Sequence, residues 1–215
     1  EIEPELNKSF GEIKSKEFEK VIIPEPLYDP NANFAFEHRD IPTAYLRFKF
    51  NAPGIMDPDY AASQLMFHIL SKQLGDEVRT KRSLSYACYA FTAQFSIGYG
   101  AIEAWTSKPE ETLAAIKQVI DKLKKSELNK KDLEEFKTVS STTYFLGLET
   151  NGSIGGGLSE AQIFHKDPNR FYDQPRDMEK VTTADIKRLA NKVLKDFRLG
   201  VIYHKDKFKK EWFIM

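Results

Sequence analysis

The sequence predicts an α+β domain, in which an antiparallel or mixed β-sheet carries helices layered on one face. Residues 44–51 alternate between apolar and polar side chains, as a strand buried on one face does. Two aromatic runs at 84–95 and 99–106 are separated by a short Ser-Ile-Gly turn, which is typical of an antiparallel hairpin. Helical periodicity then fills most of 107–193 before a last strand at 198–204. Because helices and strands are grouped along the chain, we expect the helices to form one layer against the sheet.

The composition is that of an ordinary folded domain. Hydrophobic residues make up 41% of the 215 residues and charged residues 30%, and the 32 basic residues equal the 32 acidic ones. A nucleic-acid partner normally requires a basic surplus, so none is expected. No apolar run has the length of a membrane-spanning segment. The single cysteine, Cys88, excludes an internal disulfide.

We expect three parts along the chain. Residues 1–43 hold five of the ten prolines and show little periodicity, so they are interpreted as a linker or arm with one short strand near 21–23. Their charged start does not resemble a signal peptide and looks like a chain joined in the middle. Residues 44–204 contain the regular elements of the domain. Residues 205–215 are expected to form a solvated tail.

Helix starts are predicted from capping pairs, in which a small polar residue precedes an acidic one by three positions. Such pairs are Ser107 with Glu110, Asn129 with Asp132, and Thr182 with Asp185. An earlier helix is expected to begin at Asp57 and Pro58 and to extend to about Lys81. The glycine-rich run at 151–157 is expected to interrupt the helix that starts at Asn129. This run lacks the Lys-Ser/Thr of a phosphate-binding loop.

Strand alternation assigns side chains to the two faces of the sheet. The face covered by helices is expected to carry Leu46, Phe48, Phe50, Phe91, Phe95, Ile102 and Ala104. The open face is expected to carry Tyr45, Arg47, Lys49, Tyr86, Cys88, Tyr99, Glu103 and Trp105. A one-residue bulge would reverse the assignment within a strand. Aromatic rings mixed with both signs of charge are typical of a surface that binds a peptide, and Tyr45, Arg47, Tyr99, Glu103 and Trp105 are the candidate substrate-binding residues.

The four histidines do not form a zinc-binding pair. A helix that binds zinc needs two ligands about one turn apart, and no histidine follows another by three or four residues. We therefore expect no metal site and no cofactor in this chain. Cys88 stands among aromatic residues with no histidine near it in sequence, which indicates packing and not a nucleophile.

Arg79 and Tyr86 lie in the motif V-R-T-K-x-x-L-x-Y, between an amphipathic helix and a strand. Taken alone, they could be a helix-end cation and an ordinary strand aromatic. The order of parts resembles the second half of the pitrilysin/insulinase zinc metallopeptidases, over residues 41 to about 203. The D-L-E-E-F-K helix and the V-T-T-A-D-I helix start belong to the same resemblance.

The resemblance implies a half-domain with the metalloprotease/processing-peptidase-like fold. In that family the Arg and Tyr of this motif reach toward substrate held at a zinc site in the other half, so Arg79 and Tyr86 are the candidate catalytic residues. The resemblance also implies that the zinc and its ligands belong to a partner half, on the same chain or on a separate subunit. By the same resemblance, the start of residues 1–43, ELNKSFGEI, looks like the end of a preceding zinc-binding domain.

The favoured interpretation is a non-catalytic, substrate-binding half of such a peptidase, with a peptide as its ligand and no membrane segment. Two alternatives stay open. One is an inactive scaffold or assembly subunit of the same family, and the other is a standalone module that binds an extended peptide at a sheet edge.

The isolated chain is predicted to bind no stoichiometric zinc and to cleave no peptide, because no ligand pair exists in its sequence. Elemental analysis and a peptidase assay with and without a chelator would test this. One tightly bound zinc per chain, with activity lost on chelation, would contradict it.

Overall fold

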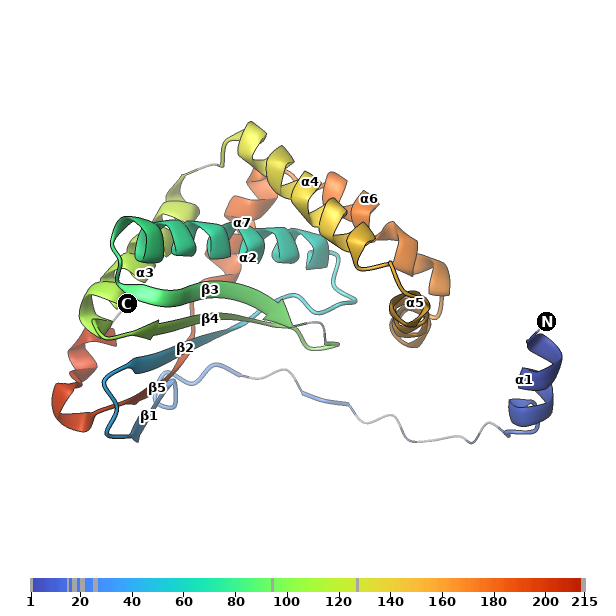
Figure 1. Cartoon of the computed structure of the whole chain (residues 1–215), viewed down its shortest axis with the longest axis horizontal. Helices are drawn as coiled ribbons and strands as arrows, with labels where there is room; N and C mark the ends of the chain where they lie inside the picture. The colour runs from blue at the N-terminus through green and yellow to red at the C-terminus, as the bar shows by residue number, and fades with distance from the viewer. Residues whose placement is uncertain are drawn as a thin grey trace.

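Five strands form one mixed sheet, and helices cover one of its faces (Figure 1). The computed structural model describes residues 2–14, 16, 19, 22–24, 27–93, 95–126 and 128–213. The strands are β1 (Phe34–His38), β2 (Ala44–Asn51), β3 (Ser85–Ala93), β4 (Tyr99–Thr106) and β5 (Arg198–Tyr203), in the order β1-β5-β2-β4-β3. Strands β1 and β5 are parallel, and all other neighbours are antiparallel. The predicted α+β class is confirmed.

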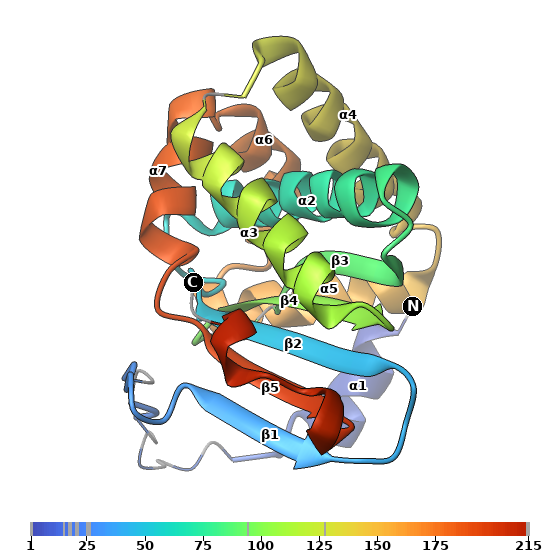
Figure 2. The same ribbon diagram turned by 90° about the vertical axis from the view of Figure 1, so that its left-hand side faces the viewer.

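The helices are α1 (Glu3–Phe10), α2 (Tyr60–Leu74), α3 (Pro109–Lys125), α4 (Lys130–Leu146), α5 (Asn151–His165), α6 (Gln174–Glu179) and α7 (Thr183–Val193). A π-helix (Gly75–Lys81) continues α2, and short 3-10 helices occur at Pro168–Asp173, Lys205–Lys207 and Lys210–Phe213. Helices α2, α3 and α7 lie on the same side of the sheet in two views at right angles (Figures 1 and 2). No helix in the described part of the chain has the length and apolar character needed to cross a membrane.

The central strand β2 shows how the sequence divides the two faces. Its side chains alternate between buried and exposed at every position. Leu46, Phe48 and Phe50 are buried against the helix layer, as predicted. Ile102 and Ala104 of β4 are buried on the same side. Each large apolar side chain that is removed from water here contributes about 1.5–3 kcal/mol, so this face anchors the helices.

Strand β3 differs from the prediction because of a bulge. Tyr86 has no partner on β4, and the register shifts by one residue at this point. One extra residue turns every later side chain of a strand to the other face. Cys88 is therefore buried and Phe91 faces the open side, so both assignments were wrong. Phe95 follows the end of β3 and is 56% exposed, so its predicted contact with the helices was also wrong.

Two of the predicted helix caps are confirmed. The Thr182 hydroxyl accepts a hydrogen bond from the Asp185 backbone, and the Asp185 carboxylate accepts one from the Thr182 backbone, which completes a capping box. The Asn129 side chain caps α4 by accepting a hydrogen bond from the Lys131 backbone.

Two other helix starts were placed wrongly. Helix α3 uses Lys108 as its N-cap, and the Thr106 hydroxyl, not Ser107, accepts the Lys108 amide hydrogen. Helix α2 begins at Tyr60, because the Asp57 carboxylate closes a local turn by accepting the Asp59 amide hydrogen.

The glycine-rich run at 151–157 does not interrupt a helix but begins one. Thr150 caps α5 through the amide of Ser153, and the break between α4 and α5 falls at 147–150. A strong local cap outweighs the low helix propensity of glycine at this point.

One edge of the sheet combines a strand from the first part of the chain, β1, with a strand from the last part, β5. Val21 of the predicted short strand lies outside the described residues, and 22–23 form no strand. Instead the unpredicted strand β1 lies within 1–43 and pairs with β5. Phe208, expected in a solvated tail, packs on Phe34 and Phe36 of β1 with ring centroids 5.6 and 4.5 Å away.

Two glycines in neighbouring parts of the sheet give a matched stability test. A Cβ at Gly100 of β4 would overlap the buried ring of Phe67 from α2, whereas a Cβ at Gly200 of β5 would meet nothing within 4 Å. We expect Gly100→Ala to lower the free energy of unfolding by about 1–3 kcal/mol through overpacking. Gly200→Ala should change it by less than about 1 kcal/mol. Urea denaturation of both variants measures the difference, and equal midpoints would contradict the close packing of α2 on β4.

Candidate functional site

The motif with Arg79 and Tyr86 lies where α2 passes through the π-helix into β3. The Leu84 amide donates to the Val78 carbonyl at 2.9 Å, and both side chains are buried, which fixes the turn to the core. Ser83 has a φ of 51°, in the left-handed region, and this reverses the chain direction. π-helical turns are rare and occur often at functional sites, which makes this segment a candidate functional site.

Arg79 and Tyr86 lie together at the surface. The guanidinium carbon of Arg79 is 5.1 Å from the centroid of the Tyr86 ring, within the range of a cation–π interaction. Tyr86 is 80% exposed, and Arg79 is exposed as well. Neither side chain makes a hydrogen bond or an ion pair with another part of the described structure. Their donor groups therefore face solvent and are free to meet a ligand.

Glu103 is the centre of a polar network on the open face. Its carboxylate lies 3.2 Å from the Arg47 guanidinium and accepts a hydrogen bond of 2.6 Å from the Tyr89 hydroxyl. This hydrogen bond raises the pKa of Tyr89, because the carboxylate favours the protonated phenol. The Arg47 guanidinium also lies 5.9 Å from the ring of Phe91. The charges of Arg47 and Glu103 are thus paired with each other and held in fixed positions.

Aromatic side chains lie beside this network on the same face. The rings of Tyr45 and Trp105 lie 5.9 Å apart, and the Lys49 ammonium lies 4.0 Å from the ring centroid of Tyr99. These contacts follow from strand pairing, since Tyr45 stands opposite Trp105 in the β2–β4 ladder. The five predicted substrate-binding residues therefore share one face of the sheet, while their binding role stays a prediction.

The Arg79–Tyr86 pair lies at a corner of this open face. Trp105 stands opposite Ala87 in the β3–β4 ladder, and Ala87 directly follows Tyr86. The aromatic surface thus continues from Tyr45 through Trp105 toward the bulge. Tyr89 and Phe91 belong to the same surface, and they were not predicted because a bulge leaves no signature in simple alternation.

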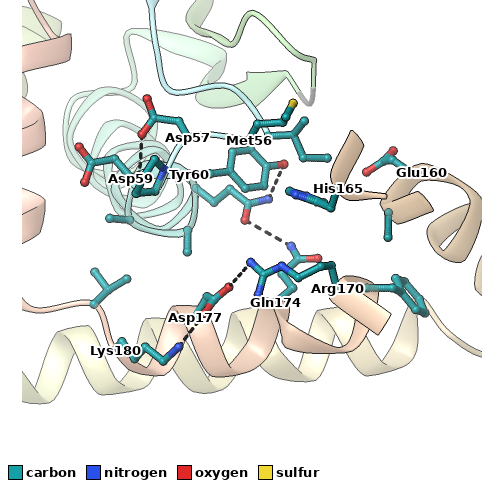
Figure 3. Close-up of a pocket in the computed structure, with 18 of the residues that line it drawn as sticks. Met56, Asp57, Asp59, Tyr60, Glu160, His165, Arg170, Gln174, Asp177 and Lys180 are labelled. Carbon is teal, nitrogen blue, oxygen red and sulfur yellow. Dashed lines mark hydrogen bonds and ion pairs between the residues drawn. The ribbon is translucent and has the colours of Figure 1, made fainter. Parts of the chain in front are cut away.

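A separate cavity of about 570 Å³ lies at the other end of α2 (Figure 3). Its charges are largely paired: Asp177 accepts hydrogen bonds from Arg170 and Lys180, and Asp59 accepts two from Arg188. None of the predicted site residues lines it. Gln64 of α2 lines it, and the stretch of helix from Gln64 to the start of the π-helix at Gly75 is about 16 Å long at the rise of an α-helix.

The histidines do not gather into a metal site. His38 and His204 form an edge-on ring pair 5.3 Å apart, whereas His68 contacts the Ser140 hydroxyl at 3.2 Å. Burial lowers the pKa of His68, so its ring is neutral at pH 7. Across the described ranges, no group of three or more His, Cys, Asp or Glu side chains could hold a metal ion. The donor set of these residues does not fit zinc.

Several solved structures have the same fold. A protease from Helicobacter pylori matches with a TM-score of 0.75 and 20% identity, covering 91% of this chain and 50% of that one. A peptidase M16 inactive domain from Pseudomonas fluorescens matches with a TM-score of 0.74 and 23% identity, covering 86% and 46%. A conserved protein from Enterococcus faecalis matches with a TM-score of 0.81 and 15% identity, covering 96% and 51%. The chain spans about half the length of these proteins. No curated protein matches it.

The family is shown by sequence. The family model described as the peptidase M16 inactive domain matches residues 1–139 of the 215, including Arg79 and Tyr86. The chain belongs to the inactive C-terminal domains of this metallopeptidase family, the family of pitrilysin and insulinase. The resemblance noted in the sequence and the fold that it implied are both confirmed.

Cys88, the only cysteine, should be unreactive in the folded protein. Burial raises the pKa of its thiol to about 12, so at pH 8 only about one thiol in ten thousand is ionised. We expect Ellman's reagent to react slowly with the native chain and fast with the chain in denaturant. Labelling of the native chain at pH 8 as fast as in denaturant would contradict the burial of the Cys88 side chain in β3.

Proposed function

We propose that this chain is the substrate-binding, non-catalytic half of a zinc metalloendopeptidase, and that it closes over a peptide held at the zinc site of another half. The observation that carries the proposal is the exposed Arg79–Tyr86 pair at the corner of an open, aromatic sheet face. Membership of the peptidase M16 family supports it.

The chemistry of the pair suits peptide hydrolysis. Negative charge develops on the carbonyl oxygen of the scissile bond, and preorganised donors lower the energy of that state. The Tyr86 phenol offers one O–H donor, and the Arg79 guanidinium offers a planar set of N–H donors that can also hold a main-chain carbonyl. Because both groups lack hydrogen-bond partners within the described residues, they can meet a substrate without breaking existing bonds.

The open face provides a surface on which an extended peptide can lie. Its exposed rings, Tyr45 and Trp105, offer apolar contact area at a low cost in side-chain entropy. The Arg47–Glu103 pair and the Tyr89 hydroxyl offer fixed polar contacts whose charges are already balanced. A peptide bound here would reach the bulge at Tyr86 at one end.

The remaining requirement is a partner half. Zinc and its ligands would belong to that half, because the described residues of this chain hold no ligand set. Matched solved proteins about twice as long as this chain are consistent with such a second half. In this proposal the present chain binds and orients the peptide, and it donates hydrogen bonds to the carbonyl oxygen.

Steady-state kinetics of the full two-half enzyme test the role of the pair. Tyr86→Phe removes one hydroxyl and keeps the ring, so kcat should fall by roughly 10²-fold, the scale for losing one oxyanion donor. Arg79→Ala should also raise KM, because it removes a contact that forms before the transition state. The zinc content should stay unchanged in both variants.

Matched controls come from exposed residues on the helix side. Tyr172→Phe and Arg176→Ala make the same chemical changes away from the sheet and should leave kcat and KM unchanged. Thermal melts verify folding. Wild-type kinetics in well-folded Tyr86→Phe and Arg79→Ala would show that the pair is structural.

A further inference from the structure

The turn that carries Arg79 contains three cations, and two of them share one carboxylate. The Lys81 ammonium lies 3.0 Å from Glu77 Oε2. The Arg82 guanidinium donates two hydrogen bonds of 2.9 and 2.6 Å to Glu77 Oε1. Arg79 has no carboxylate partner among the described residues. Glu77 therefore forms ion pairs with both neighbours, and Arg79 is the one of the three cations that has no carboxylate partner.

The π-helix accounts for this selection. It closes each turn with i→i+5 hydrogen bonds, so residues four and five positions apart share a face. Lys81 and Arg82 stand four and five residues after Glu77 and lie next to its carboxylate. Arg79, only two residues after Glu77, projects from the other side of the helix and toward Tyr86. The spacing E-x-R-x-K-R thus places Lys81 and Arg82 next to Glu77, and Arg79 next to Tyr86.

Glu77 also connects the turn to the helix layer. The Arg82 guanidinium that it holds donates a further hydrogen bond of 2.6 Å to the Gln118 side chain of α3. Hydrogen bonds from Lys81 and Arg82 lower the pKa of Glu77, so its carboxylate stays ionised under ordinary conditions. The hydrogen bonds that join Glu77 to Arg82, and Arg82 to Gln118, fix the side of the turn that faces away from Tyr86.

We propose that Glu77 is a positioning residue that keeps Lys81 and Arg82 away from the substrate and holds Arg79 over Tyr86. This inference rests on the proposed function of Arg79. Without the carboxylate, Lys81 and Arg82 lose their ion pairs and can compete with Arg79 for the same peptide carbonyls. Arg82 then still contacts Gln118 of α3 but no longer links it to Glu77, so the turn is held less firmly to α3.

A double-mutant cycle on the full two-half enzyme tests the inference. Glu77→Gln keeps the size of the side chain and removes its charge, and it should lower kcat/KM about tenfold through misplacement of Arg79. In the Arg79→Ala background the same change should have no further effect, because Glu77 acts through Arg79. Asp76→Asn is the matched control: this neighbouring carboxylate pairs with Lys72, and its loss should leave kcat/KM unchanged.

The outcomes separate this inference from the proposed function. If Arg79→Ala has wild-type kinetics, the proposed function fails and the positioning role fails with it. If Arg79→Ala is impaired, wild-type activity in folded Glu77→Gln overturns the positioning role alone, as does an equal loss in both backgrounds. If thermal melts show that Glu77→Gln is unfolded, Arg82→Gln replaces it in the cycle, because this variant removes the hydrogen bond between the turn and Gln118 of α3. It should likewise lower kcat/KM in the wild-type background and have no further effect in the Arg79→Ala background.

Discussion

One extra residue in an edge strand determines much of this domain's surface. The bulge at Tyr86 removes that residue from the β3–β4 ladder and leaves its ring in solvent. The same register shift turns Tyr89 and Phe91 to the open face and Cys88 into the core. Without the bulge, the open face would exchange a phenol that bonds Glu103 for a thiol. Bulges commonly redirect a side chain near functional sites. This bulge also determines which β3 side chains form the surface beside it.

Rigid elements of secondary structure hold Arg79 and Tyr86 in place. Helix α2 is packed along the sheet, and its π-helical continuation is closed by the buried pair Val78 and Leu84. Arg79 therefore approaches Tyr86 from a helix that is anchored over its whole length, and Tyr86 extends from a strand that β4 anchors. A site carried by a helix and a strand keeps its geometry better than one carried by mobile loops.

Residue patterns predicted the fold more completely than the site. The alternation in β2 and the capping box at Thr182 are local signals that agree with the tertiary structure. The faces of β2 and the start of α7 were therefore predicted correctly. The bulge and strand β1 depend on strands elsewhere in the sequence, and the π-turn has the same helical periodicity as the end of α2, so simple residue patterns do not reveal them. The Arg79–Tyr86 pair was found from a motif, whereas the role of Glu77 needed the direction of each side chain around the π-turn.

The parallel pairing of β1 with β5 joins the two ends of the domain. Phe34 and Phe36 near its beginning pack on Phe208 near its end, across more than 170 positions of sequence. Contacts of such separation close late in folding, because a large loop must be ordered before they form. A chain emerging from the ribosome therefore exposes one side of β2 as an unpaired edge until β5 is made, and β2 is protected from pairing with other chains only after β5 is in place.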